Sequence, residues 1–384
     1  MDREKRLQWI WRFLQRVAGG PLRRFFNYEC TPAAPGVEPY LVVANHNMDL
    51  DPALLALSFP QKRLCFLASE HVFRKGLPSR LLQFCFDPIS RMKGGTDASA
   101  SMAAIRLLRR GVSVCLFAEG NRSFNGVTGP IFPATGKLAR ASGAALITYK
   151  IEGGYLTSPR WSRTLRKGRA RGYCVNVYTS EQLRQMTPEQ INEKIARDLF
   201  EDAFARQSED PCDYVGKRLA EGLERALYIC PKCGGIGVLR SERDRFFCDC
   251  GLTLRYSAKG FFEGDGEDAP FSTVRDWDAW QDARMRALAD AVGEEPPFTD
   301  EDVRLIHIDR QHRARQAAFG RLAVSRSALC VGERSFPLNE ISDMALVGAA
   351  AIVFAVGAEH YEIRARAPSF CARKYCTLYQ MMKK

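Results

Sequence analysis

The stretch Leu41-Val-Val-Ala-Asn45-His46-Asn-Met-Asp-Leu-Asp51-Pro52 carries the clearest structural signal in this chain of 384 residues. Its four apolar residues predict a buried strand. Asp51 followed by Pro52 is a typical helix start, because aspartate caps helices and proline is favoured in the first turn. A polar turn therefore joins a buried strand to a helix. In α/β sheets, functional residues gather at such strand ends.

Strand-like and helix-like patterns alternate up to about residue 180. Apolar runs predict strands at 41–44, 63–68, 112–117, 145–149 and 173–178. Helices are predicted near 52–58, 79–85, 97–110 and 133–142, the third capped by Thr96 or Asp97, with further helices at 187–206 and 211–227. Alternation at this spacing predicts an α/β fold with a mostly parallel sheet covered by helices on both faces.

The first 30 residues predict a basic amphipathic helix that is broken at Gly19-Gly20-Pro21 and then resumed. Apolar residues recur at helical spacing from Leu7 to Val17 and again from Leu22 to Phe26, and residues 1–30 contain seven arginines and lysines. Two interpretations remain open. The helices could dock in the interface of an anionic membrane, or they could pack against their own domain.

The basic excess of the chain is confined to its first part. Residues 1–220 hold 33 basic and 20 acidic side chains, whereas residues 221–384 hold 23 and 24. This asymmetry points to an anionic partner for the first part only.

At 46% apolar residues, the chain is too hydrophobic for disorder to be expected, but its apolar runs are too short for a membrane span. No run of 18 uncharged apolar residues occurs, and Met344–Ala358, divided by Gly348, predicts two strands around a tight turn. Arg12 and Arg16 interrupt any signal-peptide core, so no signal peptide is expected.

His46 and Asp51 form a candidate catalytic pair. Histidine is the side chain best suited to take a proton near neutral pH, and a nearby carboxylate fixes its tautomer. If His46 lies on the turn and Asp51 opens the helix, the turn folds one side chain onto the other. A simpler interpretation makes Asp51 only a helix cap and His46 a polar turn residue.

Two further loops have the composition of anion-binding sites. Phe-Ala-Glu119-Gly120-Asn-Arg122-Ser follows a predicted strand: Gly120 permits a tight backbone, Arg122 offers a fork to phosphate and Glu119 can orient a donor. The other loop carries Arg91 and Lys93 just before a helix start, where backbone N–H groups could assist in holding phosphate. The alternative is that both are solvated turns.

Together and in this order, the three loops resemble the motifs of the lysophosphatidate (1-acyl-sn-glycerol-3-phosphate) acyltransferase family. Its first motif, N-H-x-x-x-x-D, is matched by Asn45, His46 and Asp51. Its second motif carries a basic residue matched by Arg91, and its third, F-P-E-G-x-R-S, is matched except at Ala118. The resemblance covers about residues 35–180.

The resemblance implies an acyl transfer to a hydroxyl group. His46 acts as general base oriented by Asp51, and Arg122 with Arg91 holds the phosphate of lysophosphatidate. The acyl group comes from a thioester of coenzyme A or acyl carrier protein, the product is phosphatidate, and the step needs no metal. The chain lacks the G-x-S-x-G turn of a covalent acyl-enzyme.

Three departures from the family pattern leave the acceptor open. Met48 stands where the family has Ser, Ala118 stands where it has Pro, and residues 146–149 lack the proline of its fourth motif. Another lysophospholipid is therefore an alternative acceptor. A non-catalytic lipid-binding adaptor is an alternative of a different class.

Residues 160–171 carry six positive charges in 12 residues. This run is interpreted either as a solvated loop or as a contact for anionic headgroups, coenzyme A phosphates or an acidic acyl carrier protein. Nucleic acid is disfavoured as a partner because Trp161 is the only aromatic residue among these charges. A peripheral position on the cytoplasmic face of a membrane is expected.

Four of the thirteen cysteines form a second motif, C-x-x-C at Cys230 and Cys233 and C-x-C at Cys248 and Cys250. This spacing predicts a structural zinc ribbon, in which four thiolates leave no open position for catalysis. A redox dithiol or plain buried cysteines are the alternatives. The other nine cysteines are scattered singly, which favours a reducing compartment. The region has no basic excess, so a nucleic-acid-binding ribbon is disfavoured.

These patterns divide the chain into four parts. Residues 1–30 are expected to be membrane-docking helices, 31–227 the acyltransferase domain and 228–256 the zinc ribbon. Residues 257–384 are expected to be an acidic, loop-rich linker up to about 310, followed by a small β-rich module with a helix near 370–382.

Overall fold

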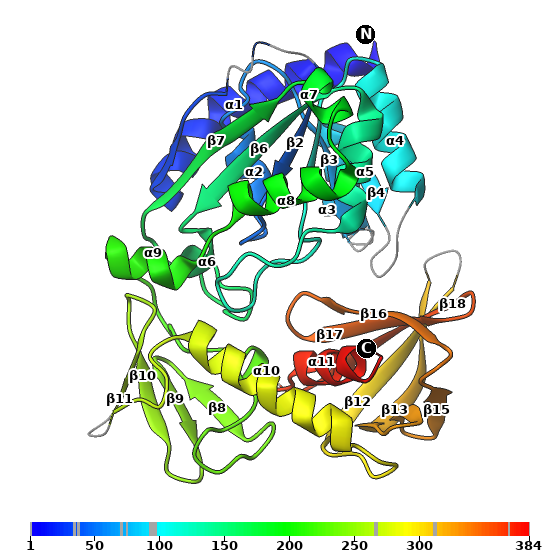
Figure 1. Ribbon diagram of the computed structural model, residues 1–384. Coiled ribbons are helices and arrows are strands. Elements are labelled where there is room, and N and C mark those ends of the chain that lie inside the picture. The colour runs from blue at the N-terminus through cyan, green and yellow to red at the C-terminus, as the bar shows by residue number, and fades with distance from the viewer. Residues whose placement is uncertain are drawn as a thin grey trace. The chain divides into compact units, whose positions relative to one another are not determined.

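The computed structural model describes residues 2–33, 36, 39–69, 72–73, 76–91, 98–264, 268–309, 313–367 and 369–383 (Figure 1). The chain divides into two compact units. The first extends to Val215, and the second consists of Trp161–Thr164 together with the chain from Gly216 onward. Over the described residues, none of the helices combines the length and apolar character needed to span a membrane.

A seven-stranded sheet forms the centre of the first unit. Its strands are β1 (Tyr28–Cys30), β2 (Tyr40–Ala44), β3 (Cys65–Ser69), β4 (Ile89–Arg91), β5 (Val114–Phe117), β6 (Ala145–Glu152) and β7 (Ala170–Tyr178), in the order β1-β7-β6-β2-β5-β3-β4. Every neighbouring pair is parallel except β6 and β7. The predicted mostly parallel sheet is confirmed.

Helices cover both faces of this sheet. They are α1 (Arg3–Phe26), α2 (Asp51–Ala56), α3 (Leu77–Phe86), α4 (Ala98–Arg109), α5 (Pro133–Ser142), α6 (Gly154–Thr157), α7 (Ser180–Arg184), α8 (Pro188–Leu199) and α9 (Ala203–Glu209). Successive residues of a strand point to opposite faces. Val42 accordingly packs in one core with Trp11 of α1, while Val43 packs in the other with Leu138 of α5. The predicted cap at Thr96 or Asp97 lies outside the described residues.

The prediction of a broken N-terminal helix was wrong, because α1 runs continuously through Pro21. Proline removes one backbone hydrogen bond, but tertiary packing fixes the helix on both sides of it. Leu7 and Trp11 are buried before the proline and Phe26 after it. Trp11 also donates from Nε1 to the Phe59 carbonyl at 2.8 Å. The packing interpretation therefore holds for one face of this helix.

The helices predicted at 187–206 and 211–227 needed correction. The first is two helices, because Asp202 starts α9 by accepting hydrogen bonds from the Phe204 and Ala205 N–H groups at 3.0 Å each. The fully described stretch 211–227 contains only the 3₁₀ turn η2 (Leu223–Arg225). Arg218 and Gly222 adopt φ of 59° and 96°, which a right-handed helix does not allow.

The second unit is built from two antiparallel sheets and two helices. One sheet has the order β11-β10-β9-β8 and consists of β8 (Leu239–Glu242), β9 (Arg245–Cys248), β10 (Thr253–Tyr256) and β11 (Phe262–Gly264). The other has the order β15-β14-β13-β12-β18-β17-β16 and consists of β12 (Thr299–Ile308), β13 (Ala314–Val324), β14 (Ala328–Val331), β15 (Arg334–Pro337), β16 (Ile341–Val347), β17 (Ala351–Val356) and β18 (Glu359–Ala365). The predicted β-rich module and its closing helix, α11 (Ala372–Met382), are confirmed.

The expectation of a loop-rich segment at 260–310 was wrong, because it contains the helix α10 (Val274–Ala291) and the strand β12. Thr273 caps α10 by accepting the Asp276 N–H at 3.0 Å. The buried side chains of α10 recur every three or four residues and include Val274, Trp277, Gln281, Met285 and Ala289. The acidic composition concealed this period, because most of the charges lie on the other face.

Buried polar contacts hold the helix α10 against the segment 228–229 and against α11. Trp277 Nε1 donates to the Ile229 carbonyl at 3.0 Å, and Gln281 Oε1 accepts the Tyr228 N–H at 2.8 Å. Asp278 forms a two-pronged ion pair with Arg373 of α11, at 2.7 and 2.9 Å. Because a buried charge needs such a partner, this pair fixes α10 against α11.

Candidate functional site

The turn after β2 brings His46 and Asp51 together as predicted. Asp51 is the first residue of α2, and its carboxyl group is fully buried. Asp51 Oδ2 lies 2.8 Å from His46 Nδ1 and also accepts the Asn47 and Met48 N–H groups at 2.6 and 2.8 Å. Three donors therefore converge on one carboxylate oxygen.

This arrangement determines how the hydrogens of His46 are placed. An ionised carboxylate only accepts hydrogen bonds, so His46 Nδ1 carries the hydrogen that faces Asp51. The neutral imidazole then has its free lone pair on Nε2. The ring stacks on Phe117 with 4.4 Å between centroids and keeps about a fifth of its surface exposed. His46 can therefore accept a proton on Nε2 while Asp51 stabilises the resulting imidazolium.

Two asparagines fasten this turn to the neighbouring strand β6. The Asn45 amide donates to the Ile151 carbonyl and accepts its N–H, both at 2.8 Å. Asn47 Nδ2 donates to the same carbonyl at 3.0 Å. The backbone of the turn is thus held from both sides, by Asp51 and by β6.

Glu119 is buried beneath the turn instead of facing solvent. Its Oε1 accepts the His46 N–H at 2.8 Å, and its Oε2 accepts the Gly129 N–H at 2.7 Å. Burial raises the pKa of Glu119 to about 7, while the two N–H donors oppose that rise. Both carboxylate oxygens already bind backbone, so Glu119 holds two loops together around His46. The spacing of the third motif showed that Glu119 belongs to the site but not that it acts in this way.

The candidate phosphate-binding residues gather around Gly120, which has φ of 66°. Arg122 Nε lies 3.2 Å from Asp49 Oδ1, and the Asp49 side chain is mostly exposed. The Arg91 guanidinium lies over the Phe132 ring, 4.7 Å from its centroid. That ring packs so closely on Gly120 that a Cβ there would come within 2.0 Å of it. Lys93 lies outside the described residues.

The basic run at 160–171 is divided between the interior and the surface, where Arg163, Lys167 and Arg171 are exposed. Arg160, Trp161 and Arg166 are buried. Arg160 lies over the Phe124 ring at 4.2 Å and donates from Nη1 to the Arg122 carbonyl at 3.0 Å. Arg171 forms an ion pair with Glu152. Much of this charge therefore stabilises the fold, and Arg160 supports the loop that carries Arg122.

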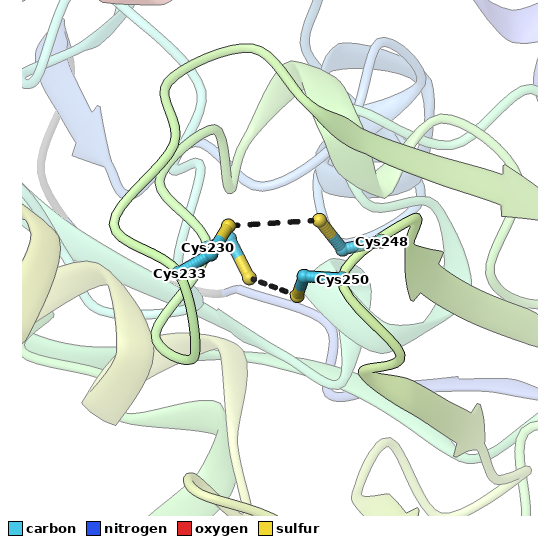
Figure 2. A group of neighbouring side chains, drawn as sticks. All are labelled: Cys230, Cys233, Cys248 and Cys250. Carbon is cyan, nitrogen blue, oxygen red and sulfur yellow. Dashed lines mark hydrogen bonds between the residues drawn. The ribbon is translucent and has the colours of Figure 1, made fainter.

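The four clustered cysteines converge in the second unit, as Figure 2 shows. All four sulfur atoms lie within 4.8 Å of one another. Cys230 Sγ is 3.7 Å from Cys250 Sγ, and Cys233 Sγ is 3.9 Å from Cys248 Sγ. A disulfide would need about 2.05 Å. These separations match the edge of a tetrahedron with metal–sulfur distances of about 2.3 Å, the value for zinc. The cluster can hold a metal ion.

The backbone around the cysteines explains why the shorter C-x-C pair suffices. Gly234 and Gly251, which directly follow the second cysteine of each pair, adopt φ of 72° and 92°. The Gly234 N–H donates to the Cys230 carbonyl at 2.9 Å, and the Gly251 N–H donates to the Cys248 carbonyl at 3.0 Å. Each pair is therefore a closed turn that directs two thiols to the same side.

Part of the first unit is similar to known proteins. Residues 26–152 match the family model described as Acyltransferase. This match agrees with the resemblance to acyltransferases drawn from the three loops. Among solved structures, the 1-acyl-sn-glycerophosphate (LPA) acyltransferase PlsC from Thermotoga maritima is similar over 51% of this chain and 79% of its own, at 20% identity and a TM-score of 0.42.

Metal content tests the cysteine cluster. We expect the purified chain to carry about one zinc ion, and Cys233→Ser to lose it, because three thiolates and a hydroxyl bind zinc far less well. Cys212→Ser, which changes a cysteine outside the cluster, is the matched control. Elemental analysis by mass spectrometry measures the ratio. Equal zinc in both variants, or none in the unmodified chain, would contradict the site.

The burial of Glu119 predicts a pH dependence of stability. Its pKa is about 7 in the folded chain against 4.5 when exposed, so the native state binds the proton more tightly. The raised pKa of Glu119 adds about 3 kcal/mol to the free energy of unfolding at low pH. This stabilisation is fully present below about pH 4.5 and is lost as the pH rises through about 7.

Urea unfolding of the unmodified chain and Glu119→Gln across this range measures that contribution. The free energy of unfolding of the unmodified chain, minus that of the variant, should fall as the pH rises. A difference that stays constant or increases with pH would refute the assignment.

Proposed function

We propose that the chain transfers an acyl group from a thioester to the sn-2 hydroxyl of a lysophospholipid, with lysophosphatidate as the leading acceptor. The observation that carries the proposal is the pairing of His46 with the buried Asp51 inside an acyltransferase domain. The similar solved structure is titled an LPA acyltransferase, which names an acceptor to test first.

The reaction needs one proton transfer and one acyl transfer. His46 Nε2 takes the hydrogen of the acceptor hydroxyl, and the oxygen attacks the thioester carbonyl. The tetrahedral intermediate collapses, the carbon–sulfur bond breaks and an ester forms. The imidazolium then returns the proton to the departing thiolate. Asp51 stabilises the imidazolium, and the fixed turn keeps Nε2 oriented throughout.

Arg122 and Arg91 bind the phosphate of the acceptor. The exposed Asp49 carboxylate lies on Arg122 Nε at 3.2 Å, so the guanidinium already binds an anionic oxygen there. A substrate phosphate can replace that carboxylate, because a phosphate with two negative charges binds arginine more strongly. Arg91 is held beside the same loop through Phe132. The acyl donor is a thioester of coenzyme A or acyl carrier protein, and the cysteine cluster holds a structural zinc ion.

Acyl transfer to lysophosphatidate is the direct test. We expect the chain to form labelled phosphatidate from a labelled acyl thioester, and His46→Ala and Asp51→Asn to lower the rate by about 10²–10⁴-fold. His360→Ala and Asp213→Asn change the same residue types outside the site and should leave the rate unchanged.

Three outcomes of this assay would contradict the proposal or narrow it. An active His46→Ala variant would contradict the role of the base. Binding of lysophospholipids without transfer to any of them would favour the non-catalytic adaptor. Transfer to other lysophospholipids but not to lysophosphatidate would keep the reaction and reject the proposed acceptor.

The exposed faces of α1 and α3 are proposed to dock on an anionic membrane. The two helices lie together, because the Arg6 guanidinium lies 4.8 Å from the Phe84 ring centroid and Arg3 pairs with Asp87 at 2.6 Å. The exposed apolar side chains on these helices include Trp9, Phe13, Val17 and Phe25 of α1 and Leu77, Leu81 and Phe84 of α3. Arg12 and Arg16 are exposed along the same helix. Aromatic residues flanked by arginines suit the interface of an anionic bilayer.

Vesicle binding tests this surface. Trp9→Ser combined with Phe13→Ser should weaken binding to phosphatidylglycerol vesicles by more than about tenfold, since each apolar side chain contributes about 1.5–3 kcal/mol when buried. Phe200→Ser removes an exposed phenylalanine elsewhere in the unit and is the control. Equal vesicle binding by all three proteins would reject the surface. If the double variant binds vesicles normally but sediments differently from the unmodified chain, the surface instead contacts a second copy of the chain.

A further inference from the structure

The second unit contains a hollow of about 440 Å³ at one end of its seven-stranded sheet. Its lining residues come from β12, β13, β15 and β18 and are His307, Arg315, Gln316, Ala317, Arg334, Glu359 and Tyr361. A hollow of this size matches the pockets that take small molecules, and the mouths of β-barrels are a common place for them. None of these residues belongs to the acyltransferase domain or the cysteine cluster.

The strand register places His307, Arg315 and Tyr361 on one face of the sheet. His307 lies directly opposite Arg315 on one side and Tyr361 on the other, and residues directly opposite in a sheet share a face. On the same face of β12, Val303 and Leu305 are buried in the core. The inward face therefore changes from apolar to polar at His307.

The same change occurs on the other strands that line the hollow. Glu359 precedes the buried Tyr361 by two residues on β18, and Arg334 precedes the buried Phe336 by two residues on β15. The sheet curls so that the rings of Phe336 and Tyr361 meet, with 4.9 Å between their centroids. Polar side chains from four strands thus surround a hollow whose floor is aromatic.

The charges around this hollow favour an anion. Glu359 pairs with His307, whereas among the described residues no ion pair is recorded for Arg315 or Arg334. Two arginines against one glutamate leave a positive balance even when His307 is neutral. Guanidinium groups that converge from different strands match the several oxygens of a phosphate better than a single carboxylate does.

We propose that this hollow is a second binding site, for an organic phosphate monoester. Arg315 and Arg334 bind the phosphate oxygens, His307 donates beside them, and the organic part lies over Tyr361. The inference is independent of the proposed acyl transfer, because it uses no residue of the catalytic unit. The phosphate can belong to a soluble small molecule or to the headgroup of a lipid.

Calorimetry with the full chain tests the soluble source. Glycerol 3-phosphate is titrated into an Arg122→Met background, which removes binding at the proposed acceptor site. We expect one site, with affinity reduced about tenfold or more by Arg315→Met, as for the loss of a charged hydrogen bond. Arg304→Met is the control, since Arg304 lies on β12 but at a position of the opposite face.

Vesicle flotation tests the lipid source. Vesicles of phosphatidylcholine with and without phosphatidate are compared for the background protein, Arg315→Met and Arg304→Met. The site is assigned to a lipid headgroup if two results are obtained together. Arg315→Met, but not Arg304→Met, loses the phosphatidate-dependent binding to vesicles, and the background protein does not bind glycerol 3-phosphate. The proposal is overturned if neither probe binds, or if Arg315→Met and Arg304→Met reduce binding equally. Neither result bears on acyl transfer, which the assay with His46→Ala measures separately.

Discussion

A single buried carboxylate oxygen organises the candidate active site. Asp51 Oδ2 receives three N–H donors, one from the His46 ring and two from the backbone of the turn. A charge that is fully buried is tolerated only where such donors compensate for lost hydration. The same bonds that stabilise Oδ2 of Asp51 also fix the shape of the turn. The same hydrogen bonds therefore orient the His46 base and stabilise the connection between β2 and α2.

The surroundings of the turn extend this constraint through the first unit. Asn45 and Asn47 tie it to β6, and Glu119 ties its backbone to the segment at Gly129. Arg160 in turn supports the Arg122 loop through a backbone carbonyl. The basic excess of residues 1–220 consequently has two origins. Part of it is exposed on α1, and part is engaged inside the fold.

The sequence predicted the features that depend on local pattern. The parallel sheet followed from short apolar runs, and the His46–Asp51 pair followed from a turn between a strand and a helix start. Features set by tertiary packing were missed. The proline at 21 lies inside a helix because packing on both sides holds it, and α10 was concealed because its acidic residues masked a regular buried period. Glu119 was placed in the site, but its partners are backbone groups distant in sequence, which no side-chain pattern reveals.

The central claim is that Asp51 holds His46 with its hydrogen on Nδ1 and a free lone pair on Nε2. Nitrogen NMR of the histidine rings in the unmodified chain, recorded where the imidazole is neutral, measures this directly. The account predicts that the His46 ring shows a protonated Nδ1 and an unprotonated Nε2, and that Asp51→Asn abolishes this preference. A neutral His46 that carries its hydrogen on Nε2 in the unmodified chain would contradict it.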